Sequence, residues 1–231
     1  MTGATERARA FTEPQGPVDI DCEPPRDCPR CPRLVAFRSA NRQSQPLWYN
    51  APVPMFGPAT AHLLIVGLAP GLKGANRSGR PFTGDYAGDL LYSTLLAHGF
   101  ARGTYAADPN DGLTLLDTRI TNAVRCVPPE NKPTPSEIAT CRDYLRATIA
   151  GMPGLRALVA LGRIAHESVL ASLGLRKSAN PFAHGRRHQV APTLALYDSY
   201  HCSRYNTSTR VLTPAMFDAV FADIRRELDA G

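Results

Sequence analysis

The chain has 231 residues, a formal net charge of +6 and a hydrophobic share of 43%, which allows one α/β domain with a sizeable core. It contains no apolar run of the roughly 18–20 residues that a membrane helix needs, and no apolar signal region at its amino terminus. We therefore expect a cytoplasmic protein without a membrane span. The basic balance, with a sequence pI of about 9.2, favours a polyanionic partner.

The first quarter of the sequence has few regular patterns. Residues 1–20 are polar, and we expect a flexible leader there, followed by a single domain over residues 21–231. Residues 31–38 have the pattern of a helix opening. Residues 43–60 are punctuated by prolines, which predicts an irregular connection.

From residue 62 onward, short apolar runs alternate with helical patterns. One helix start is marked by a capping box, with Thr134 as N-cap, Pro135 at the first helical position and Glu137 at the third. This alternation predicts an α/β fold with a parallel sheet that is covered on both faces. The expected strands are 62–67, 119–124, 156–161 and 193–197, and the expected helices are 86–98, 136–149, 163–173 and 214–228.

Four cysteines have spacings that suit one inorganic centre. Cys28 and Cys31 form a Cys-x-x-Cys pair, Cys126 follows the second predicted strand, and Cys141 lies in the next helix. In a cytosolic protein such thiols are more often metal ligands than disulfides. Iron–sulfur and zinc centres both use four thiolates, so both stay open here. Cys22 and Cys202 lie outside this set. Cys22 is close enough in sequence to replace Cys28 as a ligand.

Glycine and hydrogen-bonding residues gather where the predicted strands end. The first strand is followed by Gly67-Leu68-Ala69-Pro70-Gly71, the second ends near Asn122, the third is followed by Gly162, and the fourth leads into Ser199-Tyr200-His201-Cys202-Ser203-Arg204. In open α/β sheets, ligands bind beyond the carboxyl ends of the strands. We therefore expect a binding site at this edge of the sheet.

The glycine-rich segment 67–85 allows a ligand to approach the backbone closely. It matches neither a Walker A loop nor the dinucleotide fingerprint. Asp85 either caps the following helix or acts in catalysis, and the two roles are compatible. Phe82 either belongs to the local core or stacks on a flat base.

Two further residues at strand ends have a structural and a functional interpretation. The amide of Asn122 either joins a structural hydrogen-bond network or pairs with the polar edge of a nucleobase. A lone histidine is usually structural, but His201 follows a strand end and stands close to Ser203 and Arg204, which favours a place in a site.

Taken together, these motifs resemble the uracil-DNA glycosylase superfamily, and within it family 5, the iron–sulfur-containing B-type enzymes. The resemblance spans roughly residues 28–228. It rests on the four cysteines and on three stretches: Gly-Leu-Ala-Pro-Gly with Gly-Ala-Asn-Arg-Ser-Gly-Arg-Pro-Phe-Thr-Gly-Asp in 67–85, Thr-Asn-Ala-Val-Arg-Cys-Val-Pro-Pro-Glu-Asn-Lys-Pro-Thr-Pro in 121–135, and His-Cys-Ser-Arg-Tyr-Asn-Thr in 201–207.

The resemblance implies a three-layer α/β/α sandwich with a central four-stranded parallel sheet, and a structural 4Fe–4S cluster on Cys28, Cys31, Cys126 and Cys141. It also implies a monomeric DNA repair glycosylase that hydrolyses the N-glycosidic bond of uracil in DNA and leaves an abasic site. Other deaminated bases, hypoxanthine and xanthine, are further implied substrates.

The resemblance assigns base binding to the pocket that receives the flipped-out nucleotide. There Phe82 would stack on the base and Asn122 would bind its polar edge. Backbone amides near Gly67 and Leu68 would add hydrogen bonds to the departing base.

The expected catalytic residues are Asp85 and His201. His201 would stabilise the negative charge that develops on the departing base, and Asp85 would orient water or stabilise the cationic sugar. Ser203 and Arg204 would contact the DNA.

Two positions depart from related patterns. Family 4 enzymes carry a glutamate where this chain has Leu68, which leaves Asp85 as the candidate carboxylate. Many relatives have proline after the histidine, where this chain has Cys202. A Schiff-base lysine is not evident, so we expect no strand cleavage, and Lys73 is the one residue that could change this.

Two other classes of protein fit part of the pattern. A redox-sensing iron–sulfur protein that binds DNA without catalysis would explain the cysteines and the charge, but it needs no constellation of Asp85, Asn122 and His201. A zinc-stabilised nucleotide hydrolase is disfavoured, because the sequence has no Walker loop and no acidic metal cluster.

Overall fold

Five strands form the central sheet of the computed structural model, which describes residues 22–230. Their order across the sheet is β4-β1-β5-β7-β6. The first four in this order are parallel, and β6 pairs antiparallel with β7. The strands are β1 (Leu63–Gly67), β4 (Thr118–Asn122), β5 (Ala157–Leu161), β6 (Arg187–Ala191) and β7 (Leu194–Ser199).

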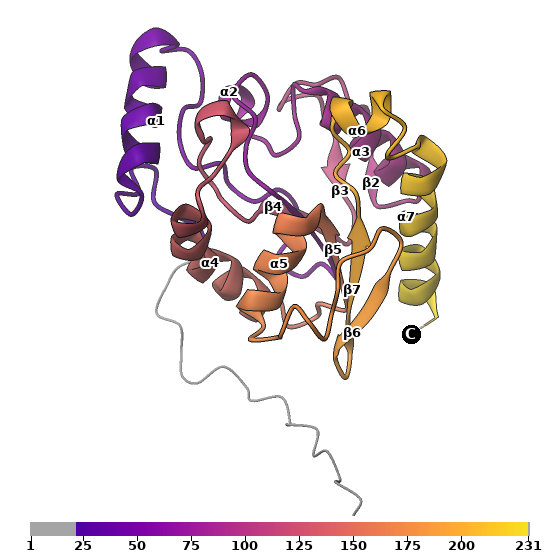
Figure 1. The fold of residues 1–231 in the computed structure, drawn as a ribbon. Helices are drawn as coiled ribbons and strands as arrows, with labels where there is room; N and C mark the ends of the chain where they lie inside the picture. Colours follow the sequence, from indigo (N-terminus) through magenta and orange to yellow (C-terminus); the bar gives the residue numbers. More distant parts are fainter. Residues whose placement is uncertain (1–21, 231) are drawn as a thin grey trace, which may run out of the picture.

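Helices cover both faces of this sheet (Figure 1). Helices α3 (Tyr86–Ala97) and α7 (Pro214–Asp229) pack on one face, and α4 (Pro135–Ala150) and α5 (Arg163–Ser172) pack on the other. Because successive side chains of a strand point to opposite faces, β1 supplies both cores, and all five of its residues are buried. The wholly apolar sequence of β1 follows from this double burial.

Helix α1 (Pro32–Ser44) stands apart from the two layers, at the side of the molecule (Figure 1). Its Leu34 joins a small separate core with Val124 and Tyr144, and the four cysteines of the predicted metal set belong to this core or pack against it. The remaining short elements are α2 (Ala75–Ser78), β2 (Ala101–Arg102), β3 (Thr114–Leu115), η1 (Pro129–Asn131) and α6 (Arg204–Ser208).

The predicted α/β class and the layered arrangement are confirmed, and the four predicted strands are the parallel ones. The prediction of a four-stranded sheet was wrong by one strand, because β6 adds an antiparallel edge. Its sequence Arg-His-Gln-Val-Ala is buried only at alternate positions, as expected for an edge strand that faces water on one side, and it lacks the apolar run by which the other strands were found.

The four helices predicted from residue 86 onward are present with ends that shift by at most one residue, and the capping box of Thr134 and Glu137 forms at the start of α4. The helix opening predicted over residues 31–38 extends further, to Ser44. The leader predicted over residues 1–20 lies outside the described residues, and the single domain over 21–231 stays a prediction. No helix within residues 22–230 is both long enough and apolar enough to span a membrane.

The carboxyl ends of β1, β4 and β7 lie on the same side of the sheet, because these strands are parallel and run in one direction. Gly67, the last residue of β1, lies opposite Asn122, the last residue of β4. β7 reaches the same edge two strands away, next to β5. The segments that leave these three strands therefore enclose a common space.

Candidate active site

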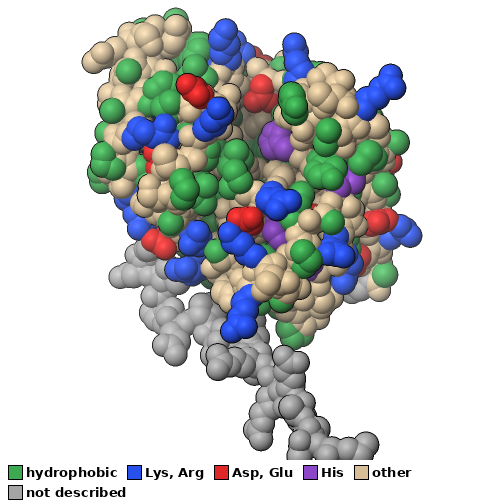
Figure 2. Space-filling view, in the orientation of Figure 1, with side chains coloured by type: hydrophobic (Ala, Val, Ile, Leu, Met, Phe, Trp, Pro, Cys, Tyr) green, Lys and Arg blue, Asp and Glu red, His purple; other side chains and the backbone are tan. Residues whose placement is uncertain are grey.

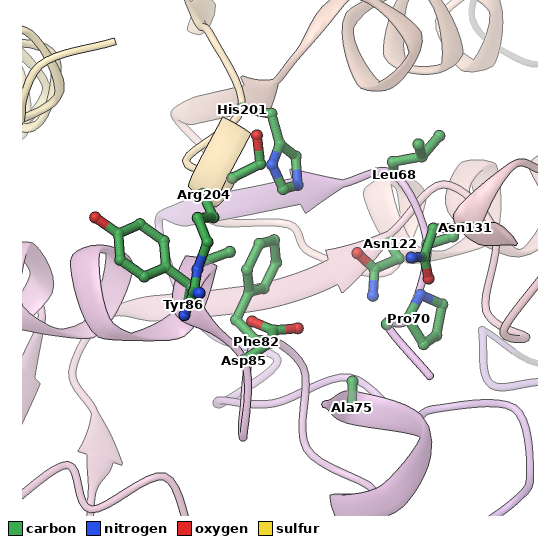
Figure 3. Close-up of a pocket in the computed structure, with 14 residues that line it drawn as sticks. Leu68, Pro70, Ala75, Phe82, Asp85, Tyr86, Asn122, Asn131, His201 and Arg204 are labelled. Carbon is green, nitrogen blue, oxygen red and sulfur yellow. The ribbon is translucent and has the colours of Figure 1, made fainter. Parts of the chain in front are cut away.

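A cavity of about 390 Å³ opens at this edge of the sheet. Its walls come from the segment after β1, the end of β4, the start of α3 and the segment after β7 (Figure 3). In the space-filling view, Lys and Arg side chains are spread over the visible face, including the surroundings of a hollow in its upper half (Figure 2). The lining residues are Leu68, Ala69, Pro70, Gly71, Ala75, Phe82, Asp85, Tyr86, Ala87, Asn122, Asn131, His201, Ser203 and Arg204.

The floor of the cavity depends on the absence of a side chain at Gly67. A Cβ atom there would lie 2.3 Å from Asn122 Oδ1 and 2.7 Å from Phe82 Cζ, both too short for real contacts. Gly67 therefore lets Asn122 and Phe82 approach each other across the end of β1. It does not line the cavity itself but sets the spacing of two residues that do.

The side-chain amide of Asn122 is buried and has no hydrogen-bond partner in the described part of the chain. Only 4% of the residue is exposed, and its side chain makes no hydrogen bond to any other residue between 22 and 230. Figure 3 shows the amide directed into the cavity. Buried amides in folded proteins are normally hydrogen-bonded. The Asn122 amide is therefore available to bind a ligand in the cavity.

Phe82 is held in a backbone conformation that bulky residues rarely adopt, with φ at 51°. Hydroxyl groups on both sides fix this turn: Tyr92 donates to Pro81 O at 2.6 Å and Tyr105 donates to Phe82 O at 3.2 Å. The ring is nearly parallel to that of His201, with 6.0 Å between the ring centroids. Strain of this kind concentrates at functional sites, and here it orients an aromatic face toward the cavity.

An ion pair between Arg80 and Asp111 also stabilises the turn that carries Phe82. The Arg80 guanidinium donates two hydrogen bonds of 2.8 Å to Asp111 and one of 2.7 Å to Thr83 Oγ1. Arg80 is 5% exposed. A bidentate pair of this geometry fixes direction as well as distance, so the strained turn has little freedom to relax.

Asp85 is the N-cap of α3, where its Oδ1 accepts from Gly88 N at 3.3 Å. Burial raises the pKa of this carboxyl, and the hydrogen bonds from Gly88 and Ala87 lower it in part. Cβ atoms at Gly71 and Gly74 would approach Asp85 Oδ2 to 3.0 and 2.4 Å. Two glycines of the segment after β1 therefore make room for this carboxylate.

His201 lies two residues beyond the end of β7 and faces the cavity (Figure 3). Burial lowers the pKa of its imidazole to about 4, so the ring is neutral at physiological pH. Its carbonyl accepts from Asn206 Nδ2 at 2.8 Å, and Ser203 caps the short helix α6 that follows. A neutral imidazole keeps one N–H to donate.

Other residues form the mouth of the cavity. Arg204 lies over the ring of Tyr86, with 5.3 Å from its guanidinium carbon to the ring centroid. Asn131 lines the opposite side, near Asn122 and Pro70 (Figure 3). Sequence reasoning did not single out Tyr86 or Asn131, because nothing in their local pattern differs from an ordinary helix start or turn.

The four predicted cysteine ligands surround a second cavity. Cys28, Cys31, Cys126 and Cys141 all line it, and none of them is in a disulfide. Burial raises the pKa of the Cys126 thiol to about 11 and that of Cys141 to about 12. The rival ligand Cys22 is not among the residues that line this cavity.

A separate buried cluster lies between α5, β6 and β7. Asp198 hydrogen-bonds His166 Nδ1 at 2.6 Å and His188 Nε2 at 2.9 Å, and His166 Nε2 reaches Asn180 O at 2.8 Å. These hydrogen bonds join α5, β6 and β7 to one another, so the cluster helps to hold the edge strand against β7.

Comparison with known protein families agrees with this geometry. A family model described as the uracil DNA glycosylase superfamily matches residues 54–225. This chain belongs to the uracil-DNA glycosylase superfamily. Three relatives are each named type-5 uracil-DNA glycosylase. The one from Thermus thermophilus is 45% identical (86% of this chain, 93% of the relative), that from Mycobacterium leprae 42% (86% and 90%), and that from Pyrobaculum aerophilum 38% (89% and 90%).

Within this superfamily member, the structure brings the predicted site residues together. Of the eight residues expected to bind or act on the base or the DNA, seven line one cavity: Leu68, Phe82, Asp85, Asn122, His201, Ser203 and Arg204. The eighth, Gly67, lies directly behind two of them. Lys73 is exposed and does not line the cavity.

The glycine requirement near Asp85 gives a stability prediction. In Gly74→Ala, the new Cβ would collide with the Asp85 carboxylate and disturb its hydrogen bond to Gly88 N. We expect the free energy of unfolding in urea to fall by about 1–2 kcal/mol, the usual effect of losing an N-cap.

Gly154→Ala is the matched control, because a Cβ at Gly154 would make only ordinary contacts, the nearest at 3.4 Å from His62 Nε2. We expect its unfolding free energy to stay unchanged or to rise slightly. Equal losses in the two variants would contradict the packing described for Asp85.

Proposed function

We propose that this protein is a monofunctional DNA glycosylase. It hydrolyses the N-glycosidic bond of uracil in DNA, and of other deaminated bases such as hypoxanthine and xanthine, and leaves an abasic site. The observation that carries this proposal is the unpartnered Asn122 amide, which is buried at the end of β4 and directed into a cavity of about 390 Å³. The names of the type-5 relatives point to the same activity.

The cavity suits a flat base that has been turned out of the helix. Phe82 presents a ring face for stacking, and Asn122 presents a donor and an acceptor on one planar edge. Uracil carries a carbonyl acceptor beside an N–H donor, so the amide pairs with both. Cytosine reverses this edge and leaves the amide facing groups that do not match.

Departure of the base leaves negative charge on it and cationic character on the sugar. His201, neutral because burial lowers its pKa to about 4, donates a hydrogen bond to the oxygen on which the negative charge develops. The main-chain amides near Gly67 and Leu68 add to this stabilisation. Donors placed where charge develops each lower the barrier by roughly 3–4 kcal/mol.

Asp85 is the one carboxylate among the residues that line the cavity. In its ionised form it stabilises the sugar cation or orients the attacking water. Leu68 offers an apolar wall where a second carboxylate would otherwise stand. Among residues 22–230 no lysine lines the cavity, which supports hydrolysis without a Schiff base and therefore without strand cleavage.

Ser203 and Arg204 contact the DNA strand beside the flipped nucleotide. Both line the mouth of the cavity, and Tyr205, next to them on α6, is 74% exposed. An exposed aromatic ring beside a cation is suited to the bases and phosphates of an opened strand. We further propose that the protein acts as a monomer.

The four cysteines hold a 4Fe–4S cluster. Their chemistry fits, since all are free thiols around one cavity and hydrogen-bond donors approach their sulfur atoms. Arg125 N lies 3.4 Å from Cys141 Sγ, and Tyr144 Oη lies 3.6 Å from Cys28 Sγ. Such contacts tune thiolate-ligated centres. When bound, the cluster supplies a covalent brace between α1, the end of β4 and α4.

The activity is tested with duplex DNA that contains a single uracil. After incubation with the protein, alkali should break the strand at the uracil position, and without alkali the strand should stay intact. Absence of alkali-labile sites with soluble, folded protein would rule out the proposed activity. Breakage without alkali would instead indicate a lyase.

Asn122→Asp tests base recognition. An ionised carboxylate has only acceptors, so we expect uracil excision to fall roughly 5- to 150-fold, as a loss of about 1–3 kcal/mol implies. Cytosine, which offers an amino donor, should gain relative to uracil. Excision rates on uracil, hypoxanthine and cytosine oligonucleotides measure this, and equal losses on uracil and hypoxanthine would assign Asn122 a structural role.

His201→Ala tests the stabilisation of the leaving base. The hydrogen bond gains strength only as negative charge develops, so single-turnover excision should slow more than tenfold while the DNA dissociation constant changes little. A parallel loss of binding and turnover would assign His201 to positioning.

The pH dependence separates the two catalytic residues. Burial raises the Asp85 pKa, so excision should fall with decreasing pH at a midpoint above the ordinary aspartate value of about 3.9. This acidic limb should vanish in Asp85→Asn and persist in His201→Ala, because it follows protonation of the Asp85 carboxylate. A midpoint near 6.5 that disappears only in His201→Ala would reverse the assignment.

For the cluster, purified protein should be brown and contain iron and acid-labile sulfide. Cys126→Ser should lose iron and unfold at a lower urea concentration, because one ligand of the brace is missing. Colourless protein that contains stoichiometric zinc would contradict the cluster and indicate a tetrahedral zinc site instead.

A further inference from the structure

Three arginines are buried in the part of the chain that the structure describes: Arg38, Arg80 and Arg125. Two of them have a carboxylate partner. Arg80 forms a bidentate pair with Asp111, and Arg125 donates to Glu23. This is the usual condition for a charge inside a protein, since a buried cation without an anion costs several kcal/mol.

Arg38 is the exception. It lies on α1 with 3% of its surface exposed, and within residues 22–230 it forms no ion pair with a carboxylate. Its Nη1 lies 3.6 Å from Cys126 Sγ, its Nη2 donates to Cys28 O at 3.0 Å, and its Nε is buried without a hydrogen-bond partner. The guanidinium therefore faces the cysteine cavity, which it helps to line.

Neighbouring charges do not supply the missing anion. The pKa of Asp27 is lowered mainly by Arg42 and to a smaller extent by the charge of Arg38. The Asp27 side chain is 71% exposed, however, and its carboxylate pairs with Arg42 at 2.6 Å. Arg30, which lines the same cavity, has its own partner in Asp143 at 2.6 Å. Neutral thiols accept hydrogen bonds weakly and carry no charge to balance a guanidinium.

A cluster bound by four thiolates changes this balance. The thiolates outweigh the positive charge of the iron–sulfur core, so the bound centre is a net anion in a poorly hydrated cavity. We propose that Arg38 is the internal counter-cation of this centre. It retains the cluster by compensating its charge and raises its reduction potential, because a nearby cation favours the added electron. This inference rests on the proposed 4Fe–4S cluster and is independent of the glycosylase activity.

Three substitutions separate the charge of Arg38 from its hydrogen bonds and its bulk. Arg38→Lys keeps the charge, Arg38→Gln keeps hydrogen-bonding capacity without charge, and Arg38→Met keeps only an unbranched apolar side chain. Arg30→Met is the matched control, because it removes a cation at the same cavity that a carboxylate already balances.

The measurements are the iron content of purified protein, the rate of iron release to a chelator, and the midpoint potential of the cluster. We expect wild type, Arg38→Lys and Arg30→Met to release iron at rates within about threefold of one another. Arg38→Gln and Arg38→Met should release it at least tenfold faster and, where the cluster persists, show a lower midpoint potential. If only Arg38→Gln and Arg38→Met lose their iron during purification, this also supports the proposal.

Several outcomes would overturn the inference. Retention of the cluster in Arg38→Gln with its loss in Arg38→Lys would show that hydrogen bonding decides, and equal loss in all three Arg38 variants would show that packing decides. An unchanged potential in Arg38→Met would also contradict it. Iron-free wild-type protein that still excises uracil would refute the cluster and leave the proposed activity standing.

Discussion

The close approach of β1 and β4 at their carboxyl ends is the contact on which the candidate site depends. Gly67 pairs with Asn122 in register, and only a residue without a side chain leaves room there for the Asn122 amide and the Phe82 ring. The same device recurs at Gly71 and Gly74, which leave space for the Asp85 carboxylate. The glycine pattern after β1 therefore creates volume for the side chains of other segments, while the parallel sheet supplies the rigid frame.

Holding polar groups unpaired in such a space costs stability, and the surrounding structure offsets it. The strained turn at Phe82 is fixed by Tyr92, Tyr105 and the Arg80–Asp111 pair. The segment that carries Asn122 continues into the cysteine-lined cavity, where Val124 packs against α1 and α4 residues. A cluster there would brace the segment that follows β4, directly after Asn122.

Much of this arrangement could be predicted from the sequence, for reasons that particular residues make clear. The strands β1 and β5 are buried on both faces and have continuous apolar sequences, and the topology of parallel strands then brings Gly67, Asn122 and His201 to one edge. β6 was missed because an edge strand with His188 facing inward has no apolar run. Asn131 and Tyr86 were missed because their place at the cavity depends on tertiary packing, and the role of Arg38 depends on a partner that is absent from its local sequence.

The most direct measurement of the central claim is a crystal structure of the protein with duplex DNA that contains 2′-fluoro-2′-deoxyuridine, whose glycosidic bond resists cleavage. The account predicts the uracil inside the cavity, with Asn122 Nδ2 about 3 Å from O4 and Asn122 Oδ1 about 3 Å from N3. The face of Phe82 should lie against the uracil ring, and His201 should lie next to O2. A uracil bound elsewhere, or bound in the cavity with the Asn122 amide turned away from its edge, would contradict it.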